Sequence, residues 1–160
     1  MLKRSRQFNE NYECLVALGL SSAEYVQQII TNPDSIERFK QEQSNLLKLN
    51  QLGLGQAVYI NILLASPNLI DQFEQYQGQF LRLNQLGLNQ IAYIQQVLER
   101  PEQFDKNYCY LKCFDLDRAE NVKKMLDCSE SRSALVEILL EAALDKAIED
   151  CRQRGAPSVI

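Results

Sequence analysis

Five cysteines are the most reactive side chains in this sequence: Cys14, Cys109, Cys113, Cys128 and Cys151. Cys109 and Cys113 are four residues apart, so on a helix they would share one face and could ligate a soft metal ion. A closed metal site needs two further ligands, only Cys128 lies nearby in sequence, and the chain contains no histidine. We therefore expect these thiols to be buried as small apolar side chains, with no metal bound.

The absence of histidine also restricts catalysis. A cysteine nucleophile is normally activated by a histidine base, and His-based acid–base catalysis is excluded outright. The sequence contains no phosphate-binding loop, dinucleotide fingerprint or nucleophile elbow. Asp115 and Asp117 are paired carboxylates, but they fall in a predicted turn, where they would cap the following helix. The sequence predicts no enzyme, no cofactor and no small-molecule substrate.

Charge and cysteine usage restrict the partners and the compartment. The chain carries 17 basic and 21 acidic residues, whereas nucleic-acid-binding domains usually carry a basic excess. An odd number of cysteines, without an apolar leader after Met1, predicts reduced thiols in the cytoplasm; secretion by a signal-independent route stays open. The longest apolar stretch, residues 134–144, is interrupted by Glu137 and Glu141, so no membrane span is expected.

Tyrosines and uncharged amides recur along the chain and form a candidate partner-binding surface. The candidate residues are Tyr25, Gln28, Tyr59, Asn61, Tyr93 and Gln96. In one interpretation the tyrosines lie in the core or at a seam, and the amides form a solvated face. In the other, they form a strip on a concave face that recognises a peptide or protein through hydrogen bonds.

The tyrosines belong to a longer internal repeat. Leu18-Gly19-Leu20 recurs as Leu52-Gly53-Leu54 and again as Leu86-Gly87-Leu88, and both steps are 34 positions long. The same step relates other positions: Tyr25, Tyr59 and Tyr93; Ile29, Leu63 and Val97; Pro33, Pro67 and Pro101. Self-similarity at this period is typical of helical repeat proteins.

Local signals within one copy predict a helical hairpin. Ser21 and Glu24 have the spacing of a capping box that opens a short helix. Asn32-Pro33 should end this helix, since the residue before proline is disfavoured in the α region, and Asn32 or its equivalent Ser66 would cap the next one. A longer helix then runs to Leu52, and Gly53 supplies the left-handed residue that terminates it.

These signals predict an all-α protein: an α-solenoid of stacked 34-residue helical hairpins, because each hairpin leaves an apolar face that a neighbour must cover. We expect a single domain over residues 1–155, with a capping helix at 7–18 and repeats at 19–52, 53–86 and 87–114. A degenerate fourth repeat at 115–155 has Phe114-Asp115-Leu116 in place of Leu-Gly-Leu, Ser129 in place of proline, and a long C-terminal helix ended by Gly155. Residues 156–160 form a short tail.

Residues 15–104 resemble the mitochondrial transcription termination factor family. The resemblance rests on Leu18-Gly19-Leu20-Ser21, the apolar pair Ile29-Ile30, Pro33 and the second-helix pair Leu46-Leu47. It implies a helical-repeat fold that binds nucleic acid along a basic surface. In this chain, however, the stretch from Leu49 to Arg82 contains one basic residue, Arg82 itself.

We expect a non-enzymatic repeat scaffold that binds a partner protein through its repeat surface, a class that includes bacterial effectors. The alternative is a nucleic-acid-binding protein of the termination-factor type, which the acidic charge disfavours.

Overall fold

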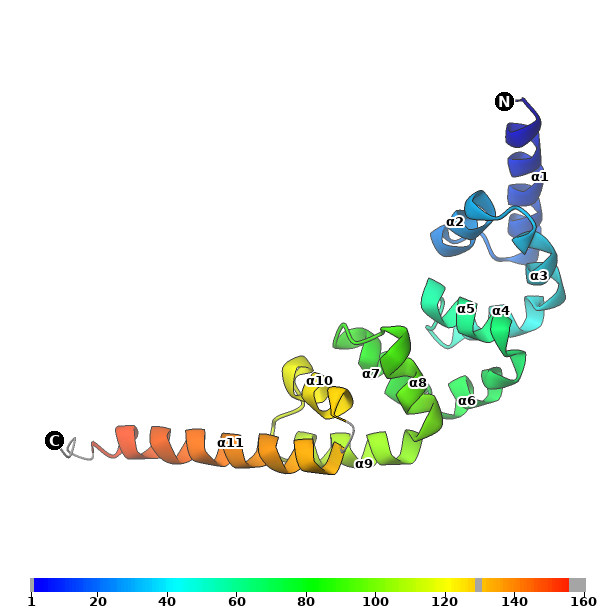
Figure 1. Ribbon diagram of the computed structural model, residues 1–160. Helices are drawn as coiled ribbons and strands as arrows, with labels where there is room; N and C mark the ends of the chain where they lie inside the picture. The colour runs from blue at the N-terminus through cyan, green and yellow to red at the C-terminus, as the bar shows by residue number, and fades with distance from the viewer. Residues whose placement is uncertain (1, 129–130, 156–160) are drawn as a thin grey trace. The chain divides into compact units, whose positions relative to one another are not determined.

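The computed structural model describes residues 2–128 and 131–155, apart from the side chains of residues 131 and 132. The helices are α1 (Leu2–Leu18), α2 (Ala23–Thr31), α3 (Ser35–Gln41), α4 (Gln43–Gln51), α5 (Ala57–Ala65), the 3-10 helix η1 (Pro67–Leu69), α6 (Ile70–Gln75), α7 (Gln77–Gln85), α8 (Ile91–Glu99), α9 (Pro101–Cys113), α10 (Ala119–Asp127) and α11 (Ser131–Gln153). The described residues contain no strand, so the predicted all-α class is confirmed (Figure 1).

The chain divides into two compact units, Met1–Arg82 and Leu83–Ile160. The expected single domain over residues 1–155 therefore stays a prediction. Two features of the sequence analysis, the replacement of proline by Ser129 and the tail at 156–160, lie outside the described residues.

Each predicted glycine turn has the left-handed backbone that it requires. Gly53 has φ +80°, and the amides of Gly53 and Leu54 donate to the carbonyls of Asn50 and Leu49 at 3.0 and 3.1 Å. This pair of bonds is the Schellman motif, which satisfies the last carbonyls of a helix. Gly19, Gly87 and Gly155 also have positive φ, as predicted.

Asp115 takes the place of glycine at the end of α9. It has φ +59°, and the Leu116 amide donates to the Leu111 carbonyl at 2.8 Å, as in the other turns. The predicted capping role of the two aspartates is wrong, because Arg118 stands at the N-cap of α10. Asp117 instead accepts a hydrogen bond from the Tyr108 hydroxyl at 2.8 Å.

Three short helices begin at evenly spaced positions along the sequence. Helices α2, α5 and α8 each contain nine residues, and their first residues are 34 apart. Helix α10 also has nine residues, but the step from Ile91 to Ala119 is shorter, as expected from the shortened fourth copy. The predicted capping box is wrong, because α2 begins at Ala23 and its N-cap, Ser22, makes no side-chain cap bond. Ser21 therefore lies one residue too early to cap the helix.

The proline turns follow the prediction more closely. Asn32, Ser66 and Arg100 all leave the helical region, with φ between −139° and −144°, immediately before a proline. The predicted capping by Asn32 or Ser66 is wrong. The N-cap of α3 is Asp34, whose amide donates to the Asn32 side-chain oxygen at 3.2 Å, and Ser66, the N-cap of η1, makes no side-chain cap bond.

The predicted longer second helix is broken in the first two copies, which corrects the sequence analysis. Glu42 and Tyr76, one repeat step apart, depart from helical dihedrals and separate α3 from α4 and α6 from α7. After each break a glutamine side chain donates to the last carbonyls of an earlier helix: Gln43 to Leu18 at 3.2 Å and Gln77 to Leu52 at 2.9 Å. In the third copy the second helix, α9, is a single unbroken helix of 13 residues.

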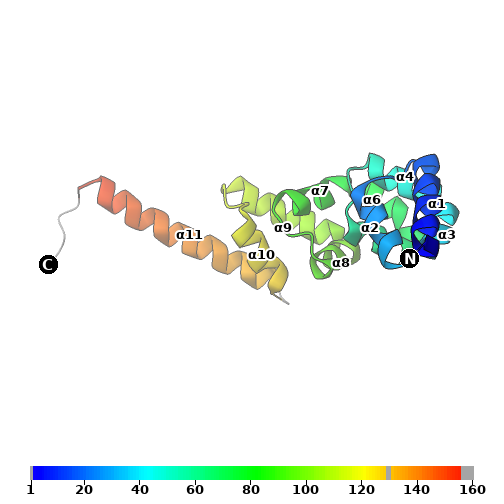
Figure 2. The same cartoon turned by 90° about the horizontal axis from the view of Figure 1, so that it is seen from above.

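In unit 1, α1 contacts both α2 and α3 (Figures 1 and 2). Helix α1 begins at Leu2, so it extends five residues before the start predicted at residue 7. Its fully buried Leu15 lies with Leu20, Phe39 and Leu46 in the core.

In unit 2, α11 packs against α9 and α10 with only one of its faces. Leu135 and Ile138 are buried there, as predicted. Both views show α11 running on beyond α10 (Figures 1 and 2), and every described residue from position 143 onward is exposed. The apolar residues of the C-terminal helix predict that Ala143 and Ile148 help to seal the end of the solenoid, and this expectation is wrong because both are exposed.

Among the described residues, no helix has the length and apolar character that crossing a bilayer requires.

Candidate protein-binding site

Two of the predicted partner-binding tyrosines belong to the core of unit 1. Tyr25 and Tyr59 have no exposed surface, so placing them on a binding surface was wrong, and the alternative of core residues holds. The Tyr25 hydroxyl donates to Asn50 Oδ1 at 3.0 Å, and the Tyr59 hydroxyl donates to the Phe80 carbonyl at 3.3 Å. Burial raises the pKa of Tyr25 to about 12 and raises the pKa of Tyr59 as well.

The two amides predicted in unit 1 have different surroundings. Asn61 is exposed, on the solvated side of α5. Gln28 is half-buried, and its Nε2 has no hydrogen-bond partner among the described residues. No hydrogen bond joins these two side chains in the described part of the chain.

Tyr93 and Gln96, the two predicted residues of unit 2, both reach from α8 to the end of α10. The Tyr93 hydroxyl donates to Asp127 Oδ1 at 2.5 Å, and Gln96 Nε2 donates to the Leu126 carbonyl at 2.8 Å. The hydrogen bond to Asp127 raises the pKa of Tyr93. Both bonds hold the C-terminal end of α10 against α8.

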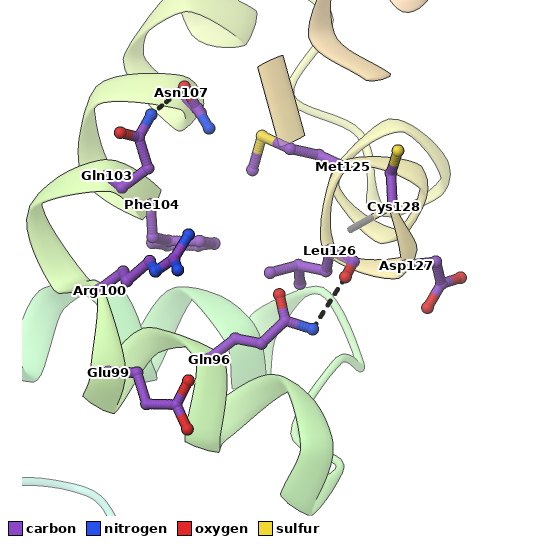
Figure 3. Close-up of a pocket in the computed structure, with 10 residues that line it drawn as sticks. All are labelled: Gln96, Glu99, Arg100, Gln103, Phe104, Asn107, Met125, Leu126, Asp127 and Cys128. Carbon is purple, nitrogen blue, oxygen red and sulfur yellow. Dashed lines mark hydrogen bonds between the residues drawn. The ribbon is translucent and has the colours of Figure 1, made fainter. Parts of the chain in front are cut away.

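A pocket of about 320 Å³ opens beside these contacts, within unit 2. It is lined by Gln96, Glu99, Arg100, Gln103, Phe104, Asn107, Met125, Leu126, Asp127 and Cys128. Figure 3 shows α8, α9 and α10 on three sides, with Phe104, Met125 and Leu126 turned toward the interior. The pocket therefore has an apolar floor and a rim of polar groups, the composition usual for ligand sites.

The pocket borders Asn107, a position at which the two preceding copies of the repeat carry phenylalanine. Phe39 and Phe73 are fully buried and pack edge-on against Tyr25 and Tyr59, with ring centroids 5.3 and 5.7 Å apart. The next residue at this step, 34 positions after Phe73, is Asn107. Because asparagine is smaller than phenylalanine, it leaves space that an aromatic ring would fill.

Asn107 is a buried polar residue that lines the pocket. Only 4% of it is exposed, and its Oδ1 accepts a hydrogen bond from Gln103 Nε2 at 3.0 Å. Its Nδ2 has no acceptor among the described residues, and Figure 3 shows this nitrogen directed toward the interior. Because this nitrogen faces the open pocket, it can donate to an acceptor that enters there.

Comparison with known proteins gives no match for the chain, whether with protein families, curated proteins or solved structures. The resemblance to the mitochondrial transcription termination factors stays a prediction.

The charged residues at the rim are exposed and of both signs. Glu99 and Asp127 contribute carboxylates and Arg100 a guanidinium. The described residues contain no cluster of three or more metal-ligating side chains. Cys109 and Cys113 are exposed, so the expectation that they are buried was wrong, because the face of α9 that carries them turns to solvent.

A second hollow, of about 520 Å³, lies between α1 and α2 in unit 1. Arg4, Phe8, Asn11 and Ile30 are among its lining residues, and Asn11 donates to the Pro33 carbonyl at 3.3 Å. Gln28 Nε2 in α2 is a buried amide donor without a partner among the described residues, but Gln28 does not line this hollow.

Gln96 was predicted from the sequence, whereas Gln103, Phe104 and Asn107 were not. A signal for Asn107 was present, because an asparagine at a position where two copies carry phenylalanine breaks the apolar pattern of the core.

Proposed function

We propose that this protein is a non-enzymatic α-solenoid scaffold that binds a partner protein. Three features support stacked helical hairpins: nine-residue helices at a constant step, glycine turns with equivalent hydrogen bonds, and the paired glutamine bonds from Gln43 and Gln77. Such hairpins stack in a row and present an extended binding surface.

The observation that carries the binding function is the pocket beside Gln96 and Asn107. Neutral amides donate and accept hydrogen bonds without the desolvation cost of a charge, which suits the polar groups of a protein partner. The apolar floor would bury one of that partner's side chains. The five cysteines are unpaired, which supports a reducing compartment such as the cytoplasm.

The charges favour a protein partner over nucleic acid. Several cations of the described chain already pair with carboxylates: Arg6, Lys40, Lys48, Lys123 and Lys124. At the pocket itself, Arg100 shares the rim with the carboxylates of Glu99 and Asp127. Since phosphate binding depends on unpaired cations, this surface offers little attraction to a nucleic-acid backbone.

The test is affinity capture with the full chain from nuclease-treated lysate, followed by reconstitution with the purified captured protein. The expected result is a stoichiometric complex that Gln96→Arg weakens, since an arginine there places an unneeded charge at the rim. Gln95→Arg is the matched control, because Gln95 is exposed on the same helix and does not line the pocket.

Gel shifts with DNA and RNA over a range of salt concentrations complete the test. Binding that falls steeply as salt rises, with no protein captured, would support the nucleic-acid alternative and contradict the scaffold.

A further inference from the structure

The pocket in unit 2 offers one donor and one acceptor that other described residues leave unused. The donor is Asn107 Nδ2, and the acceptor is Gln96 Oε1, whose neighbouring Nε2 is occupied by the Leu126 carbonyl. Figure 3 shows both atoms directed toward the interior, one from α9 and one from α8. A donor and an acceptor that face one space complement the carbonyl and the N–H of a peptide main chain.

We propose that this pocket binds an extended segment of the partner polypeptide, an inference that rests on the proposed scaffold function. Asn107 Nδ2 donates to one main-chain carbonyl of the segment, and Gln96 Oε1 accepts from one main-chain N–H. An apolar side chain of the segment packs on Phe104, Met125 and Leu126.

The segment must be extended, because the main-chain groups of a helix are already bonded to one another. A volume of about 320 Å³ holds one apolar side chain with the main chain beside it, and not a second element of secondary structure. The Asn107 side chain is held in place by Gln103, so the donor is oriented before the segment arrives.

The charges at the rim balance. Glu99 and Asp127 contribute exposed carboxylates, Arg100 contributes a guanidinium, and Lys123 Nζ lies 4.0 Å from Asp127 Oδ2. The charge of the residues beside the apolar side chain therefore has little effect on affinity, which depends on the apolar side chain and the main-chain hydrogen bonds.

Fluorescence polarisation with short synthetic peptides tests the inference on the full chain. The probes carry leucine at the centre, flanked by lysine, alanine or glutamate, and a second set has N-methylated amides on both sides of the leucine. We expect the three flanking residues to give similar affinities and N-methylation to weaken binding about ten-fold, since it removes the N–H from which Gln96 Oε1 accepts.

Two variants locate the binding. Gln96→Ala removes the acceptor and Asn107→Asp removes the donor while keeping the shape, so each weakens the peptide about ten-fold. Gln95→Ala, on the exposed side of α8, leaves affinity unchanged. Circular dichroism verifies the fold of each variant, and Gln96→Ala, at a position that is not fully buried, keeps the test valid if Asn107→Asp unfolds.

Equal binding of the N-methylated peptides, or unchanged affinity in Gln96→Ala, overturns the inference. So does tighter binding of helical peptides, or no binding of any probe at millimolar concentration. If the captured partner still binds in these cases, the scaffold function survives and only the pocket inference fails. If no protein is captured either, both fail.

Discussion

Asn107 stands in α9 at the position that Phe73 occupies in α6, three residues after Phe104 and Ile70 respectively. Phe73 is fully buried and packs edge-on against Tyr59, whereas Asn107 borders the open pocket of unit 2. The change from an aromatic ring to a carboxamide reduces the volume of the side chain and adds a hydrogen-bond donor. One position thus distinguishes a packed core from a candidate binding site.

This relationship predicts the effect of Asn107→Phe. The ring would occupy the pocket and bury apolar surface, so we expect the free energy of unfolding to rise by about 1 kcal/mol. Peptide binding should be lost, because both the space and the Nδ2 donor disappear. Urea unfolding and fluorescence polarisation measure the two effects. A less stable variant would mean that the ring overpacks the site.

The glycine turns predict a graded response to alanine. Gly87→Ala imposes a side chain on a residue with φ +71°, which should lower the free energy of unfolding by about 1 kcal/mol. Gly53→Ala should cost more, because its Cβ would also lie 3.1 Å from Leu81 Cδ2. Urea unfolding measures both changes.

Gly78 provides the matched control for these glycines. It lies in α7 without positive φ, and a Cβ there would meet nothing within 4 Å. Gly78→Ala should therefore raise the free energy of unfolding by about 0.5 kcal/mol, because alanine has the higher helix propensity. Three equal losses would contradict the explanation by backbone conformation.

The turn after α9 predicts a stabilising substitution. Asp115 has φ +59°, a conformation that costs an L-residue energy and glycine none, so Asp115→Gly should raise the free energy of unfolding by about 0.5 kcal/mol. Asp105→Gly, at an exposed position inside α9, should lower it by about 1 kcal/mol. Thermal unfolding of the two variants and of the wild type measures both changes in stability. A less stable Asp115→Gly variant would refute the prediction.

The buried tyrosines predict a loss of stability in alkali. The pKa of Tyr25 rises from 10.0 to about 12 in the folded chain, chiefly because burial disfavours the phenolate. Below about pH 10 the phenol is neutral in both states, and its contribution to stability is fully present. As pH climbs from about 10 to about 12, the unfolded chain ionises first and this contribution is lost.

Ultraviolet absorbance of tyrosinate, followed together with circular dichroism, measures this loss. The Tyr25→Phe variant should lose less stability over the same pH range, because it has no phenol to ionise there. An identical alkaline transition in the variant would show that Tyr25 is not responsible.

The sequence by itself determined where glycine turns and prolines end helices. A positive φ at Gly19, Gly53 and Gly87, and an extended residue before each proline, depend on interactions within a few residues, so local patterns predict them. The constant repeat step was readable for the same reason. The capping box failed because α2 begins one residue later than its spacing requires, with Ser22 at the N-cap and no side-chain cap bond.

Only the tertiary structure decided which side chains are covered and which stay available. The breaks at Glu42 and Tyr76, the full burial of Tyr25 and Tyr59, and the opening beside Asn107 all depend on neighbours distant in sequence. Burial is a property of packed surfaces, and a periodic pattern states only which residues share a face. The pocket exists because α8, α9 and α10 meet around an asparagine too small to fill the space between them.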